Sequence, residues 1–172
     1  MIKKKNKTTS KEGFKQFDKL LRILLLIGII VISGFILYAL FNPEPGYVTL
    51  GILNSDKKAE DYPTQANIGE NISFYVTVGN YMKREFQFSL EILKGNEDTT
   101  LNSTGSYNAE SFFNTTKEIL AHSDTWISNM LNVSFSQPGA NQSIIVELWE
   151  LISSDTRKYI DMVYIKSLEI LP

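Results

Sequence analysis

The chain has 172 residues, of which 43% are hydrophobic and 21% charged, with a formal net charge of −2 and no cysteine. The absence of cysteine excludes a disulfide framework, a thiol nucleophile and a cysteine-ligated zinc site. The single histidine, His122, cannot form a histidine cluster for a metal, so we expect no metal site. Charge is uneven: residues 1–22 hold eight of the seventeen basic residues and two acidic ones, and the region after Phe41 holds nine basic and seventeen acidic residues.

Residues 20–41 are apolar almost throughout, and residues 23–41 carry no charged side chain. At ~1.5 Å per residue, a helix over these nineteen residues spans about 29 Å, close to the ~30 Å hydrocarbon core of a bilayer. A helix also satisfies every backbone group within lipid. The bulky residues after it, from Tyr38 to Pro43, do not resemble a signal-peptidase site. We predict an uncleaved transmembrane helix over 20–41.

The lysine-rich segment 1–19 stands directly before this helix. Basic residues beside a membrane span stay in the cytoplasm, so we predict a cytoplasmic tail over 1–19, with its first ten residues disordered. Phe14, Phe17 and Leu21 recur at helical spacing, which leaves open an amphipathic helix on the inner leaflet, although topology alone explains the lysines. The chain is then a single-pass protein of the cell membrane, with its carboxyl-terminal region extracytoplasmic.

Residues 42–46 read Asn-Pro-Glu-Pro-Gly. Two prolines remove backbone donors and restrict the residues before them, so a helix ends here. We predict a short, stiff linker over 42–46 that keeps the following domain, 47–172, close to the membrane.

After the linker the apolar period changes from 3.6 residues to two, which is typical of half-buried antiparallel strands. The clearest alternation covers 71–79 and 84–94, which we expect to pair as a hairpin across 80–83. Residues 109–122 fit a helix or a strand, and we favour a strand. The last strand places Lys166 on its apolar side, which indicates a bulge or an edge. Further strands are expected at 48–52, around 99–101, and at 126–135, 143–151 and 159–171.

Seven or so strands in about 130 residues favour two packed antiparallel sheets. The predicted fold is therefore all-β: an immunoglobulin-like antiparallel β-sandwich ectodomain preceded by a single transmembrane α-helix.

Six segments from residue 46 onward resemble the exterior part of archaeal membrane proteins of the domain-of-unknown-function 1616 family, in order and in spacing. They are 50–53 (LGIL), 58–63 (KAEDYP), 68–71 (IGEN), 78–81 (VGNY), 138–142 (PGANQ) and 145–149 (IVELW). Family members are typically longer, with several membrane helices before this region, whereas this chain has one candidate span. The resemblance implies an archaeal surface-facing membrane protein and no catalytic activity.

The strongest chemical signal is a set of Asn-x-Ser/Thr glycosylation sequons outside the predicted membrane span. Three lie in predicted loops, and two lie on predicted strands but on the polar face. Asn6 also begins a sequon, but on the cytoplasmic side, where it should stay unmodified. The acceptor residues in the exterior region are Asn71, Asn102, Asn114, Asn132 and Asn141.

Two aromatic residues are candidates for an interaction surface. Trp149 falls on the side of its strand opposite Val146 and Leu148, so it either forms an exposed binding aromatic or packs at a sheet edge or the membrane interface. Tyr62 follows the acidic loop around Asp56, and it either contributes to that surface or pins the loop against the sheet. The loop lacks the ligand spacing of an EF-hand calcium site.

No residue pattern supports catalysis or a cofactor. His122, Ser123 and Asp124 are adjacent, so they cannot form the spatial relay of a triad. The acidic exterior region argues against nucleic acid. We favour a non-enzymatic interaction or structural module that contacts the lipid bilayer and a surface protein or glycan. The alternatives are an accessory subunit with a multi-pass membrane partner and, last, a carbohydrate-active enzyme with paired carboxylates.

Overall fold

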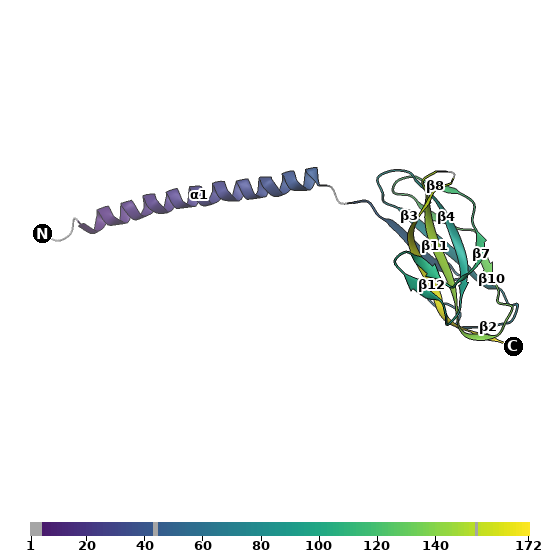
Figure 1. The fold of residues 1–172 in the computed structure, drawn as a ribbon. Coiled ribbons are helices and arrows are strands. Elements are labelled where there is room, and N and C mark those ends of the chain that lie inside the picture. Colours follow the sequence, from purple (N-terminus) through teal and green to yellow (C-terminus); the bar gives the residue numbers. More distant parts are fainter. Residues whose placement is uncertain (1–4, 43–44, 154) are drawn as a thin grey trace. The chain divides into compact units, whose positions relative to one another are not determined.

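The computed structural model describes residues 5–42, 45–153 and 155–172, with side chains from Gly13 onward. The chain divides into two compact units, Met1–Pro45 and Gly46–Pro172. The first holds one helix and the second holds all the strands (Figure 1).

Helix α1 runs without interruption over Lys5–Phe41 (Figure 1). Its part from Gly13 to Phe41 is long and apolar enough to cross a membrane, and none of it is buried within the protein. The predicted disorder of the first ten residues is wrong for residues 5–10, which are helical, while residues 1–4 lie outside the described residues. Residues 5–41 contain no proline that would interrupt the helix. Asp18 and Arg22, one turn apart, form an exposed ion pair of 2.8 Å that stabilises it.

The strands form two main sheets, which confirms the all-β antiparallel sandwich. A four-stranded sheet has β3 at its centre, with β1 on one side and both β9 and β10 on the other. A six-stranded sheet has the order β2-β12-β11-β4-β7, with β8 also paired to β4. Only the β2–β12 pair is parallel. The bounds are β1 Val48–Leu53, β2 Gln65–Asn67, β3 Ile72–Asn80, β4 Phe86–Gly95, β7 Glu110–Asn114, β8 Glu118–Leu120, β9 Thr125–Ile127, β10 Leu131–Val133, β11 Gly139–Leu151 and β12 Arg157–Leu171.

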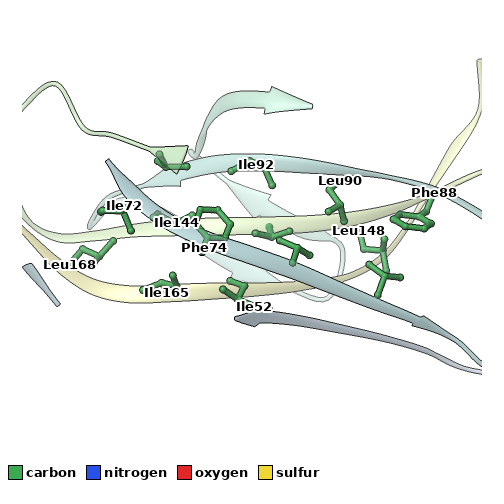
Figure 2. Close-up of a cluster of buried hydrophobic side chains, with 14 of the residues drawn as sticks. Ile52, Ile72, Phe74, Phe88, Leu90, Ile92, Ile144, Leu148, Ile165 and Leu168 are labelled. Atoms are coloured by element: carbon green, nitrogen blue, oxygen red, sulfur yellow. The ribbon is translucent and has the colours of Figure 1, made fainter. Parts of the chain in front are cut away.

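The core lies between these sheets and is built from the alternating residues of the long strands (Figure 2). Burying one such side chain contributes about 1.5–3 kcal/mol, so the three central strands provide most of the stabilisation. Their core residues are Ile72, Phe74, Val76 and Val78 on β3, Phe86, Phe88, Leu90 and Ile92 on β4, and Ile144, Val146 and Leu148 on β11.

A third, two-stranded sheet is the hairpin of β5 (Thr100–Asn102) and β6 (Gly105–Tyr107). It confirms the short strand expected around residue 100. Residues 109–122 contain β7 and β8, so the strand interpretation of this ambiguous segment is also confirmed.

The predicted hairpin between residues 71–79 and 84–94 is wrong. The two segments form β3 and β4, which belong to different sheets and face each other across the core. β3 instead has β1 on one edge, with Val48 opposite Asn80, and β9 and β10 on the other. Period-two alternation marks the face that a strand buries, and it is the same for strands that pair and for strands that face each other.

The predicted strand over 126–135 is divided into β9 and β10, and both pair with β3. Ser128 lies in the gap between them. Its N–H donates to the carbonyl of Val76 at 2.9 Å, and its buried hydroxyl accepts from the N–H of Val76 at 2.9 Å. A side-chain hydroxyl thus replaces a backbone carbonyl, which interrupts the ladder without leaving a group unpaired.

The last two strands confirm the expected long pair and the irregularity near Lys166. Ile165 pairs with Ile144 but Leu168 pairs with Gln142, so β12 has one extra residue there. Ser167 takes a positive φ of 58° at this bulge.

The fully buried Asn80 ties together the loops at the end of the sandwich where the linker joins it. Its side chain satisfies three backbone groups, and its own backbone satisfies two more. Nδ2 donates to the carbonyls of Arg84 (2.8 Å) and Leu120 (2.9 Å), Oδ1 accepts from Met82 N–H (2.9 Å), and the backbone bonds reach Ser123 and Asp124.

We predict that Asn80→Ala lowers the free energy of unfolding by about 2–4 kcal/mol, because three backbone groups lose their partner and each net hydrogen bond contributes about 1 kcal/mol. Urea unfolding of the full chain in detergent, followed by tryptophan fluorescence, measures this. Asn129→Ala is the matched control, since Asn129 is exposed, and it should change stability by less than about 0.5 kcal/mol. Equal effects of the two changes would contradict the role of Asn80.

Candidate functional site

The five sequon asparagines are all exposed. Asn71 stands just before β3, Asn132 lies in the middle of β10, and Asn102 and Asn114 are the last residues of β5 and β7. Asn141 lies within β11 at a register shift, with a positive φ of 57°. The loop positions predicted for Asn102, Asn114 and Asn141 are therefore wrong, because all three lie on strands. The side chains of all five are therefore available on the surface.

The amide nitrogens of these five asparagines donate no hydrogen bond to any described residue. The other asparagines of the sandwich differ, because most of them use Nδ2 to hold a loop together. Nδ2 of Asn54, Asn67, Asn80 and Asn108 donates to a carbonyl or carboxylate oxygen. In the five sequon asparagines, the nitrogen atom to which an N-glycan is attached is thus not held by a hydrogen bond to a described residue.

At two sequons the amide oxygen of the asparagine accepts a hydrogen bond from a sequon hydroxyl. Oδ1 of Asn102 accepts from the Thr104 hydroxyl at 2.7 Å and the Thr104 N–H at 2.8 Å. Oδ1 of Asn132 accepts from the Ser73 hydroxyl at 2.6 Å. Ser73 belongs to the sequon of Asn71, and it lies directly opposite Asn132 on the neighbouring strand.

A second cluster of polar residues lies on the outer face of the six-stranded sheet, around Glu147 of β11. This carboxylate is buried, with 4% of the residue exposed. Oε1 accepts from the N–H of Ser106 at 2.6 Å and from its hydroxyl at 2.7 Å, and Oε2 accepts from Nε1 of Trp149 at 3.2 Å. Glu147 therefore holds the β5–β6 hairpin against the sheet. Gly105 makes this close approach possible, because a Cβ there would lie 3.2 Å from Oε1.

Trp149 points to the outer face as expected, but its ring is half-buried by neighbours. The guanidinium of Arg157 lies 4.1 Å from the ring centroid, and Tyr159 packs edge-on at 5.5 Å. Burial raises the pKa of Tyr159, and the charges of Glu147 and Asp161 raise it further. The ring face covered by Arg157 is not open to a flat ligand such as a sugar.

The sequence model of the DUF1616 family matches residues 43–158 of this chain, which is more than half of its length. The chain belongs to the DUF1616 family, a domain of unknown function. No curated protein matches it. The six segments that carry the resemblance all fall within the matched range, and three of them contain Tyr62, Asn80 and Glu147.

Several solved structures are similar to this DUF1616 chain at low identity. The CARDB domain of the PF1109 protein from Pyrococcus furiosus, in complex with di-metal ions, is 10% identical with a TM-score of 0.45, over 74% of this chain and 90% of that one. The C-terminal domain of wzt is 10% identical with a TM-score of 0.48, and the match covers 76% of this chain and 84% of that one. A β-glucosidase from Listeria innocua in complex with glucose is 13% identical with a TM-score of 0.41, and the match covers 73% of this chain and 17% of that one.

In this DUF1616 chain Tyr62 pins the acidic loop to the four-stranded sheet. Its hydroxyl donates to the carbonyl of Ile52 at 2.7 Å, its ring packs against the core, and burial raises its pKa. Asn54 closes the loop from the other side, with Nδ2 donating to the carbonyl of Glu60. Within the part of the chain that the structure describes, no three acidic or histidine side chains are grouped as a metal site would require.

Glu91 and Glu147 lie directly opposite each other on β4 and β11, a pairing that the sequence did not reveal. Both are engaged. Glu91 pairs with Arg157 at 2.9 Å and accepts from Ser111 at 3.1 Å, and Glu147 has the three donors described above. Glu147 therefore holds the hairpin, and Glu91 links β4 to Arg157 of β12 and Ser111 of β7.

We predict that Glu147→Ala loosens the β5–β6 hairpin, with faster amide hydrogen exchange at residues 100–107 and a loss of about 1–3 kcal/mol in stability. Glu147→Gln keeps the acceptor oxygen and should have a smaller effect. Hydrogen exchange with mass spectrometry on the full chain in detergent measures both. Glu85→Ala, an exposed carboxylate at the other end of β4, is the control. Unchanged exchange at residues 100–107 in Glu147→Ala would refute the anchoring role.

Proposed function

We propose that this DUF1616 protein is a single-pass membrane protein, with the lysine-rich tail over residues 1–19 in the cytoplasm and the β-sandwich outside. The observation that carries the proposal is an apolar helix that no part of the described chain covers, joined to a separate compact sandwich. Exposed apolar surface on this scale requires lipid or another apolar partner. The lysines before residue 23 favour the cytoplasmic side for the amino terminus.

The sandwich acts as a non-enzymatic interaction or structural module. Its paired acids are bound to Arg157, Ser106 and Trp149, so the carboxylate chemistry of a glycosidase is not available there. It is also a glycoprotein domain, modified at one or more of the five sequons. The exposure of these asparagines and their uncommitted Nδ2 atoms support this.

The absence of cysteine gives a direct test of the orientation. Single-cysteine variants Glu97→Cys, in an exposed loop of the sandwich, and Ser10→Cys, in the tail, are treated with a membrane-impermeant maleimide. We expect labelling of Glu97→Cys in intact cells, and labelling of Ser10→Cys only after lysis, because the bilayer separates the two positions. The reverse pattern, or labelling of both only after lysis, would refute the proposal.

Glycosylation is tested by intact-mass and glycopeptide measurement on protein purified from its native membranes. We expect the wild-type mass to exceed that of the polypeptide, and each Asn→Gln change at an occupied sequon to remove the mass of one glycan. Asn129→Gln is the matched control, because Asn129 is equally exposed but followed by Met130-Leu131. A wild-type mass equal to that of the unmodified polypeptide would exclude glycosylation.

A further inference from the structure

The two ends of the sandwich differ in which residues they present. The end where the chain joins β1, here called the linker end, consists of Tyr47 and of residues 81–85, 121–124, 151–153 and 155–156. None of the five sequons lies on these segments. β2 and the carboxyl terminus lie at the opposite end, here called the far end (Figure 1).

The chain is clamped where it joins the linker end. The carbonyl of Tyr47 accepts from the N–H of Tyr81 at 2.9 Å, and the two rings stack with centroids 4.9 Å apart. Gly46 packs directly on Met82, since a Cβ at Gly46 would lie 2.4 Å from the Met82 Cα. The path from the membrane helix to the sandwich is therefore fixed from Gly46 onward.

This clamp limits how far the linker end can be from the membrane surface. Only residues 42–45 separate Phe41, the last residue of α1, from Gly46. At a maximum of ~3.3–3.6 Å per residue, this path allows at most about 18 Å. Without the clamp, residues 46 and 47 would lengthen it further.

The chemistry of the linker end suits a lipid headgroup layer. Tyr47 and Ile152 are large side chains with 59% and 58% exposure. Lys83 and Arg84 are also exposed at this end, but Arg84 pairs with the buried Glu150 at 2.6 Å, and the exposed carboxylates of Glu85, Asp124 and Asp155 outnumber the two cations. Tyrosine is enriched at membrane interfaces, where its ring is partly buried and its hydroxyl stays hydrated. The far end has a larger excess of negative charge, with six exposed carboxylates against the exposed Lys57 and Lys58, and anionic headgroups would repel it more strongly. The exposed carboxylates there are Asp56, Glu60, Asp61, Glu70, Glu97 and Asp98.

We infer that the linker end rests on the headgroup layer of the bilayer, with Tyr47 and Ile152 at the apolar boundary and the sequons directed away from it. This inference rests on the proposed membrane anchoring. The sandwich then stands on the membrane in a restricted orientation, and its far end is the part presented to the surroundings.

The test uses the full chain in phosphatidylcholine nanodiscs, with a fluorescent nitrobenzoxadiazole label on single cysteines. Ile152→Cys and Ser153→Cys place the probe at the linker end, and Glu97→Cys places it at the far end. Two variants in the same turn are used so that the test can still be made if one of them does not fold. Lipids with a nitroxide on the headgroup should quench both linker-end probes more than about twofold more strongly than the far-end probe.

Equal quenching at the two ends overturns the inference, as it would if a protein partner rather than lipid occupied the linker end. Ile32→Cys, within α1, separates this failure from failure of the anchoring itself. Its probe should be quenched by lipids with a nitroxide in the acyl chain. Loss of quenching at Ile32 would show that α1 is not in the bilayer, and would overturn both proposals.

Discussion

Each of the alternating apolar side chains on β3, β4 and β11 has to be covered by the facing sheet, and the arrangement of the sandwich depends on this requirement. Burial of a large apolar side chain contributes a few kcal/mol, whereas one more cross-strand pair contributes less than 1 kcal/mol. Facing β3 against β4 covers both apolar faces, but pairing them as a hairpin would cover neither. The chain therefore crosses between the sheets at residues 81–85.

Where the chain crosses between the sheets, some backbone N–H and C=O groups have no partner on a neighbouring strand. Buried polar side chains form hydrogen bonds with these groups instead. Asn80 does this at the linker end, and Glu147 does the equivalent for the β5–β6 hairpin on the outer face. Both residues lie in segments by which the sequence resembles DUF1616, as does Tyr62. Three of these segments therefore contain a residue that holds a loop or a hairpin in place.

Strand positions could be predicted from the sequence, but strand partners could not. Alternation located β1, β3, β4, β11 and β12 within a few residues, because period two marks which face is buried. It contains no information on the neighbour, so β3 and β4 were wrongly paired. The division of 126–135 depends on the Ser128 hydroxyl, and the pairing of Glu91 with Glu147 depends on register between distant segments. The acceptor asparagines were found from their motif, but their uncommitted Nδ2 atoms became visible only in three dimensions.

The hydrogen bonds and ion pairs of these polar side chains also decide which surfaces remain open to a partner. The β5–β6 hairpin and the Glu91–Arg157 pair close much of the outer face of the six-stranded sheet. The sequons of Asn71 and Asn132 adjoin on the four-stranded sheet, so a glycan at either would cover that edge. The two ends are left, and the Gly46 clamp limits the distance of one of them from the end of α1. If that end is occupied by lipid, the far end is the surface left exposed, and its carboxylates outnumber its exposed lysines, Lys57 and Lys58.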